Sequence, residues 1–178
     1  MAGAGDRAAG EGAAAGGAAG RLIEAVSAGL AVAGGLVLVA ILLASIASIL
    51  GRALFSAPIP GDFELVEIGC AVAVFSFLPW CQLRRGNVIV DVFTSGAPLP
   101  VKAALDLAGA LLLAAIAALL ARQLWLGLID VKAYNDRSMV LGLPLWWGFC
   151  VAVPATAWLA VVAAYTAWRD FALLRGRS

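Results

Sequence analysis

Residues that could carry chemistry are few in this chain, and histidine is absent. Without imidazole, the chain lacks the usual general base and the commonest side-chain ligand of haem and zinc. The three cysteines, Cys70, Cys81 and Cys150, form no CxxC pair and are too dispersed for a disulfide framework. We therefore expect a protein that is not an enzyme and has no bound cofactor or metal.

The charged residues are also few and nearly balanced. Among 178 residues there are 12 Lys+Arg and 11 Asp+Glu, a net charge of +1, which argues against nucleic-acid binding because that requires a clustered basic surface. Hydrophobic residues make up 63% of the chain and charged residues 13%. Soluble proteins have roughly 45–50% and about 25%, so the composition predicts a protein embedded in a lipid bilayer.

Apolar segments divide the chain into four predicted transmembrane helices, which makes the expected fold all-α. Crossing the hydrocarbon core takes about 20 predominantly apolar residues, and the expected spans cover about residues 22–50, 63–83, 101–129 and 140–168. They form a membrane domain over 21–170, between a disordered Ala/Gly-rich tail at 1–20 and a second tail at 171–178. The short apolar stretch 88–93 is expected to be an interfacial helical turn, since a lone strand in a bilayer leaves its backbone unpaired.

The distribution of basic residues predicts the orientation. Four spans put both termini on one face, and that face collects eight Lys and Arg residues against three on the other. Positive loops stay in the cytoplasm, so both termini are expected there and the loops 51–62 and 130–138 are expected outside.

Arg122 is the charge whose place inside a span needs an explanation. On a helix it shares a face with four small residues, Ala104, Ala108, Ala115 and Ala118. We therefore expect Arg122 to point into protein near the outer end of the third span and to pair with Glu67 or Glu64. The alternative is that all three snorkel separately to the headgroups. Asp106 is expected to be solvated, or paired with Arg84, Arg85 or Lys102.

Four motifs occur in a fixed order along the spans. They are ELVE at 64–67, RRGNVIVD at 84–91, Leu99-Pro100, and SMVLGLPLWW at 138–147, which contains Pro144 and Trp146. In this order the chain resembles the small membrane subunit of tripartite ATP-independent periplasmic (TRAP) transporters, the DctQ-like small permease. The similarity covers about residues 21–170.

The resemblance implies ion-coupled uptake of organic acids such as carboxylates across a bacterial inner membrane, together with two partners. One is a large membrane subunit that carries the substrate, and the other is a periplasmic substrate-binding protein. The small subunit would brace the first and help dock the second. Candidates for docking are Asp62, Lys132, Tyr134, Asn135 and Arg137. Candidates for anchoring the cytoplasmic interface are Arg84, Arg85 and Asp91.

A stand-alone four-helix transporter or channel is the alternative function. It requires polar or charged groups at mid-depth, whereas the ionisable residues of this chain are expected at the ends of the spans. That distribution favours a supporting subunit.

Overall fold

The fold is built from four long helices. The computed structural model describes residues 17–56, 60–84 and 99–175. Within these ranges the helices are α2 (Ala18–Phe55), α3 (Asp62–Leu83), α5 (Leu99–Tyr134) and α6 (Trp146–Arg175), and the described backbone forms no strand beyond an isolated bridge. All four are long and apolar enough to cross a membrane, which confirms the predicted all-α membrane fold. The predicted turn at 88–93 lies outside the described residues.

Three helices extend beyond the predicted spans. α2 begins at Ala18, so the last residues of the expected tail 1–20 are helical, and α6 runs to Arg175, well into the expected tail 171–178. The extension of α6 contains Ala172, Leu173, Leu174 and Arg175, which are good helix formers, so this helix continues past its apolar stretch. α2 and α5 end where the next residues, Ser56 and Asn135, adopt positive φ values of 51° and 53°, which helical backbone does not allow.

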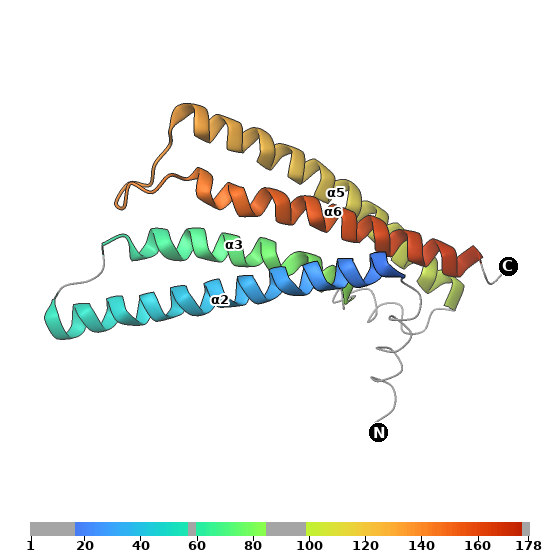
Figure 1. The fold of residues 1–178 in the computed structure, drawn as a ribbon, viewed down its shortest axis with the longest axis horizontal. Coiled ribbons are helices and arrows are strands. Elements are labelled where there is room, and N and C mark those ends of the chain that lie inside the picture. The colour runs from blue at the N-terminus through green and yellow to red at the C-terminus, as the bar shows by residue number, and fades with distance from the viewer. Residues whose placement is uncertain (1–16, 57–59, 85–98, 176–178) are drawn as a thin grey trace, which may run out of the picture.

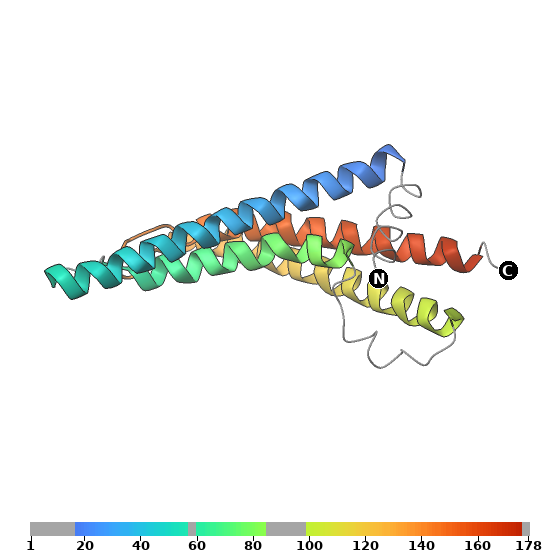
Figure 2. The same cartoon turned by 90° about the horizontal axis from the view of Figure 1, so that it is seen from below.

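The helices lie in a row instead of a closed bundle. α2 packs on α3, α3 on α6 and α6 on α5, and no other pair of described helices packs to a similar extent. Figure 1 shows this order, with α6 between α3 and α5. In Figure 2, α2 and α5 diverge toward the end where α2 begins. The row therefore consists of two antiparallel hairpins joined through α3 and α6.

Glycines let α2 and α3 approach closely. A Cβ added at Gly34 would lie 2.9 Å from the Cβ of Ser76 and 3.2 Å from the carbonyl oxygen of Ala73. Gly69 of α3 faces Ile41 of α2, whose Cγ2 would be 2.5 Å from an added Cβ. Membrane helices have no hydrophobic effect to drive their association, so small residues that permit backbone contact are a main source of packing energy.

Polar side chains that are buried or half-buried connect α6 to both helices of the other hairpin. The Gln82 side-chain amide donates to the hydroxyl oxygen of Thr166 at 3.1 Å, and both residues are buried. The indole N–H of Trp158 donates to the hydroxyl oxygen of Ser27 at 3.1 Å. Such bonds satisfy polar groups that have no water available in the bilayer.

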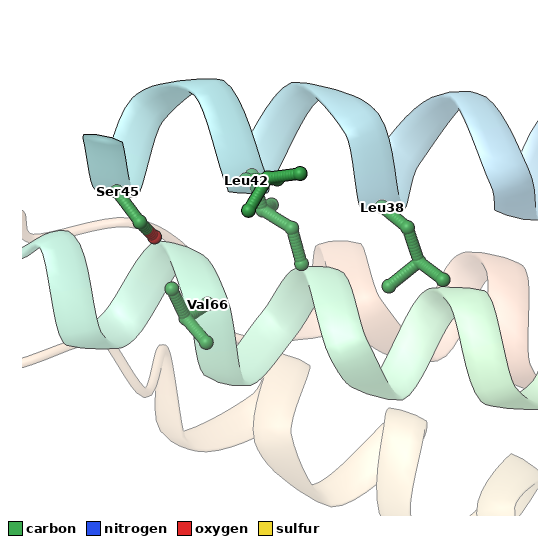
Figure 3. A pocket seen from close by; sticks show the side chains of 5 residues that line it. Leu38, Leu42, Ser45 and Val66 are labelled. Atoms are coloured by element: carbon green, nitrogen blue, oxygen red, sulfur yellow. The ribbon is translucent and has the colours of Figure 1, made fainter. Parts of the chain in front are cut away.

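The surface between α2 and α3 contains a shallow hollow of about 260 Å³ (Figure 3). Leu38, Ile41, Leu42 and Ser45 of α2 and Val66 of α3 line it. A carboxylate entering it would lose its hydration and find one hydroxyl donor in return, so the hollow does not suit an anionic substrate.

The packing predicts different effects for the same substitution at two adjacent glycines. Gly35 has nothing within 4 Å of an added Cβ, whereas Gly34 abuts Ser76. Gly34→Ala and Gly35→Ala gain the same helix propensity, roughly 1 kcal/mol, so their difference isolates the packing. We expect Gly34→Ala to be less stable than Gly35→Ala by about 1–3 kcal/mol, measured as a melting temperature several degrees lower in detergent. Equal melting temperatures would contradict the close contact at Gly34.

Candidate functional site

Glu64, near the start of α3, binds the backbone of the connection between α5 and α6. Its Oε1 accepts the N–H of Val140 at 2.8 Å, and its Oε2 accepts the N–H of Leu141 at 2.9 Å. Two of the four sequence motifs, ELVE and SMVLGLPLWW, therefore meet at one end of the row. A carboxylate that accepts two backbone N–H groups forms charge-assisted bonds, which are stronger than those between neutral groups.

The connection itself is a compact turn, which corrects the predicted start of the fourth span. The N–H of Ser138 donates to the carbonyl oxygen of Leu143 at 2.9 Å, and the N–H of Leu143 donates to Ser138 Oγ at 3.0 Å. Gly142 supplies a positive φ of 64°. α6 begins at Trp146, not near residue 140, because helical backbone does not allow the positive φ of Gly142 and Pro144 disfavours helical backbone at the residue before it.

Pro144 and Trp146 lie on either side of the start of α6: Pro144 is in the connection, and Trp146 is the first residue of the helix. Pro144 is half-buried and forms an isolated antiparallel bridge with Arg137. Trp146 opens the helix, and its ring meets that of Trp147 edge-on, with the ring centroids 6.3 Å apart. The amphipathic indole suits the boundary between hydrocarbon and headgroups.

The residues at the start of α3 contact both this turn and α2. Gly61 has a φ of 72°, and a Cβ there would collide with the side chain of Leu141. The Asp62 carboxylate accepts a hydrogen bond from the Ser48 hydroxyl of α2 at 2.7 Å and one from the Phe63 N–H at 2.9 Å. Both carboxylate oxygens of Asp62 therefore accept hydrogen bonds from within the chain.

Four other predicted docking residues remain available at this end. Lys132 and Tyr134 close α5, and Asn135 and Arg137 follow in the turn; all four are exposed. Asn135 and Arg137 belong to the connection that Glu64 binds, and Lys132 and Tyr134 lie directly before it.

At the opposite end of the row, Arg84 joins α3 to α2. Its guanidinium lies 3.3 Å from the Glu24 carboxylate and 4.5 Å from the centre of the Trp80 ring. Both charged side chains are about half exposed, so the ion pair contributes little, about 0–1 kcal/mol. Glu24 is not among the residues predicted from the sequence to form a contact, although an antiparallel hairpin brings the residues flanking its two helices to one end. Asp106 is half-buried, and Arg85 and Asp91 lie outside the described residues.

The predicted pairing of Arg122 with Glu67 or Glu64 is wrong. Within the described residues no ion pair joins Arg122 to either glutamate, because Glu64 binds backbone N–H groups and Glu67 is exposed. The reason lies in the order of the helices, because α6 stands between α5 and α3. Arg122 is itself exposed.

Contacts between the helices also correct the depth of Arg122. Gly127 of α5 faces Phe149 of α6, and the neighbouring Gly148 faces Ile68 of α3. The next residue of α3, Gly69, faces Ile41 of α2, so these positions share one level.

Arg122 lies five residues from Gly127, roughly 7–8 Å toward the end where α2 begins. On α2 the corresponding level is near Leu36, close to the middle of the uncharged stretch between Glu24 and Arg52. Arg122 is therefore at mid-depth, not near the outer end. A charged residue at the centre of an isolated transmembrane helix costs about 2.5–3.5 kcal/mol on insertion scales.

Comparison with known proteins identifies the family. A sequence model described as "Tripartite ATP-independent periplasmic transporters, DctQ component" matches residues 41–173. The chain belongs to the DctQ family. It is accordingly the small permease component of a TRAP transporter and a multi-pass membrane protein. No curated protein and no solved structure matches it. The matched region includes the Glu64 contact and all of the α5–α6 connection of this DctQ chain.

Removing the charge of Glu64 should loosen the α5–α6 connection of this DctQ chain. In Glu64→Gln one side-chain oxygen remains to accept a hydrogen bond, and the amide N–H₂ opposes a backbone N–H. We expect the amides of Val140 and Leu141 to exchange with deuterium several-fold faster, as measured by mass spectrometry on the protein in nanodiscs. Glu67→Gln is the matched control, because Glu67 is exposed one turn after Glu64 and its substitution removes the same charge. Equal exchange in both variants would count against the bracing role of Glu64.

Proposed function

We propose that this DctQ-family chain is a fixed scaffold that braces the large membrane subunit of a TRAP transporter during ion-coupled uptake. The observation that carries the proposal is the open row of helices. A row leaves broad apolar faces on both sides, and large hydrophobic residues are exposed along all four described helices. Such faces suit contact with lipid on one side and with a second membrane protein on the other.

Apart from Arg122 at mid-depth, which departs from the expected placement of ionisable residues at the span ends, the described helices lack the features of a carrier. Transporter binding sites are commonly formed by discontinuous helices near the middle of the bilayer, where free helix ends face the substrate. Each described helix of this chain is continuous over its whole length, and the described hollow is apolar. A separate large subunit would therefore perform the transport movement, and organic acids such as carboxylates are the substrate class that the family resemblance supports.

The second part of the proposal places the α5–α6 connection on the periplasmic side of a bacterial inner membrane. The excess of basic residues at the end that holds both termini supports this orientation, because positive segments remain in the cytoplasm. Lys132, Tyr134, Asn135 and Arg137 then face the periplasm, where a substrate-binding protein would dock on them.

Purification of the transporter tests the scaffold. A tag on this chain should retain the large membrane subunit of the same transporter when both are extracted in mild detergent. Vesicles with both subunits and the binding protein should accumulate a radiolabelled organic acid, and vesicles lacking this chain should not. Accumulation by this chain alone would instead support the stand-alone transporter.

Charge reversal tests docking and orientation together. We expect Lys132→Glu combined with Arg137→Glu to lower uptake about tenfold at limiting binding-protein concentration, with recovery at saturating concentration, because charge complementarity mainly affects encounter. Arg52→Glu is the control, since Arg52 is exposed at the same end but outside the connection. Unchanged uptake in the double variant would contradict docking on this surface.

A further inference from the structure

Arg122 combines three properties that are unusual together. It lies near mid-depth, its side chain is exposed, and it forms no hydrogen bond or ion pair with any described residue. Charged side chains inside membranes almost always pair or face water, so an unpaired arginine on the outside of the row indicates a missing partner.

Its surroundings indicate what can approach it. Ala104, Ala108, Ala115 and Ala118 share its face of α5, and all four are exposed. This alanine face, which was expected to pack against protein, is therefore not covered by another described helix. It would allow a helix of a partner to come close to Arg122. The α6-facing side of α5 is different, since Ala110 and Ala117 are buried there.

We propose that Arg122 forms an intersubunit ion pair with a carboxylate on a transmembrane segment of the large subunit. This rests on the proposed function and adds the partner group that the scaffold recognises. A guanidinium binds a carboxylate through two parallel hydrogen bonds, which gives direction as well as strength. The pair would fix which face of α5 meets the large subunit and at what depth.

Two other occupants fit less well. Lipid phosphates lie at the headgroups, about 15 Å from the middle of the hydrocarbon core. A second copy related by an axis along the membrane normal would present its residues at equal depths. The described carboxylates of this chain, among them Glu24, Asp62, Glu67 and Asp130, lie near the helix ends and not at the level of Arg122.

Co-purification of the transporter through a tag on this chain tests the pair. Arg122→Gln should lower the recovered large subunit about tenfold or more while the membrane level of this chain is unchanged, because the large subunit keeps an unpaired buried carboxylate. Arg122→Lys should recover part of the loss. Arg52→Gln, which removes an exposed charge at the end of α2, should have no effect.

Crosslinking locates the partner independently of stability. A photoreactive residue at Ala118, one turn from Arg122, should crosslink to the large subunit, whereas one at Leu120, which is exposed on the opposite side of α5, should not. Mass spectrometry of the adduct identifies the nearby acidic residue. Exchanging the two charges, Arg122→Glu with that residue changed to Arg, should then restore co-purification.

The outcomes separate this inference from the proposed function. If the wild-type chain retains no large subunit, both are rejected. If Arg122→Gln retains as much as wild type, or Ala118 crosslinks to a second copy or only to lipid, the scaffold stands and the ion pair is rejected.

Discussion

The contact of α3 with α6 and with the connection that precedes α6 holds the two helical hairpins in one body, because α2 packs mainly on α3 and α5 mainly on α6. It is made at three levels. Glu64 binds the backbone at Val140 and Leu141, Gly148 packs beside Ile68, and Gln82 bonds to Thr166. A slip of one helical turn, about 5.4 Å, would break the polar contacts at both ends. The relative height of the two hairpins is therefore set by hydrogen bonds, while apolar packing occupies the space between them.

The number and type of helices could be predicted from the sequence because a bilayer permits few alternatives. Backbone polar groups must be satisfied within each segment, so an apolar stretch of sufficient length becomes a helix. The residues at which the helices begin and end were harder to predict. Hydropathy marks where the hydrocarbon ends, not where the helix does, and α5 and α6 continue past that point. At Pro144 the stop signal was present, but the apolar residues around it were interpreted as part of the span.

The partners of the charged residues could not be predicted from the sequence, and this holds even for the flanking pair of Arg84 and Glu24. Glu64 binds main-chain N–H groups, and Asp62 binds a serine in another helix. Neither partner has a recognisable pattern in the sequence. The depth of Arg122 depended on the register of four helices, which single-sequence periodicity does not contain. Its neighbouring alanines were correctly recognised as one face, yet that face is open and not packed within the chain.

The unequal lengths of the helices have a further consequence. α3 has 22 residues and measures roughly 33 Å, little more than a hydrocarbon core of about 30 Å, whereas α2 has 38 residues and measures roughly 57 Å. α3 is also the central element to which α2 and α6 are fastened. In a thicker membrane its ends, with Glu64 and Arg84, would be the first groups drawn into hydrocarbon. The short central helix thus makes this row of helices sensitive to bilayer thickness, whereas the longer helices extend beyond the hydrocarbon core and can cross a thicker one.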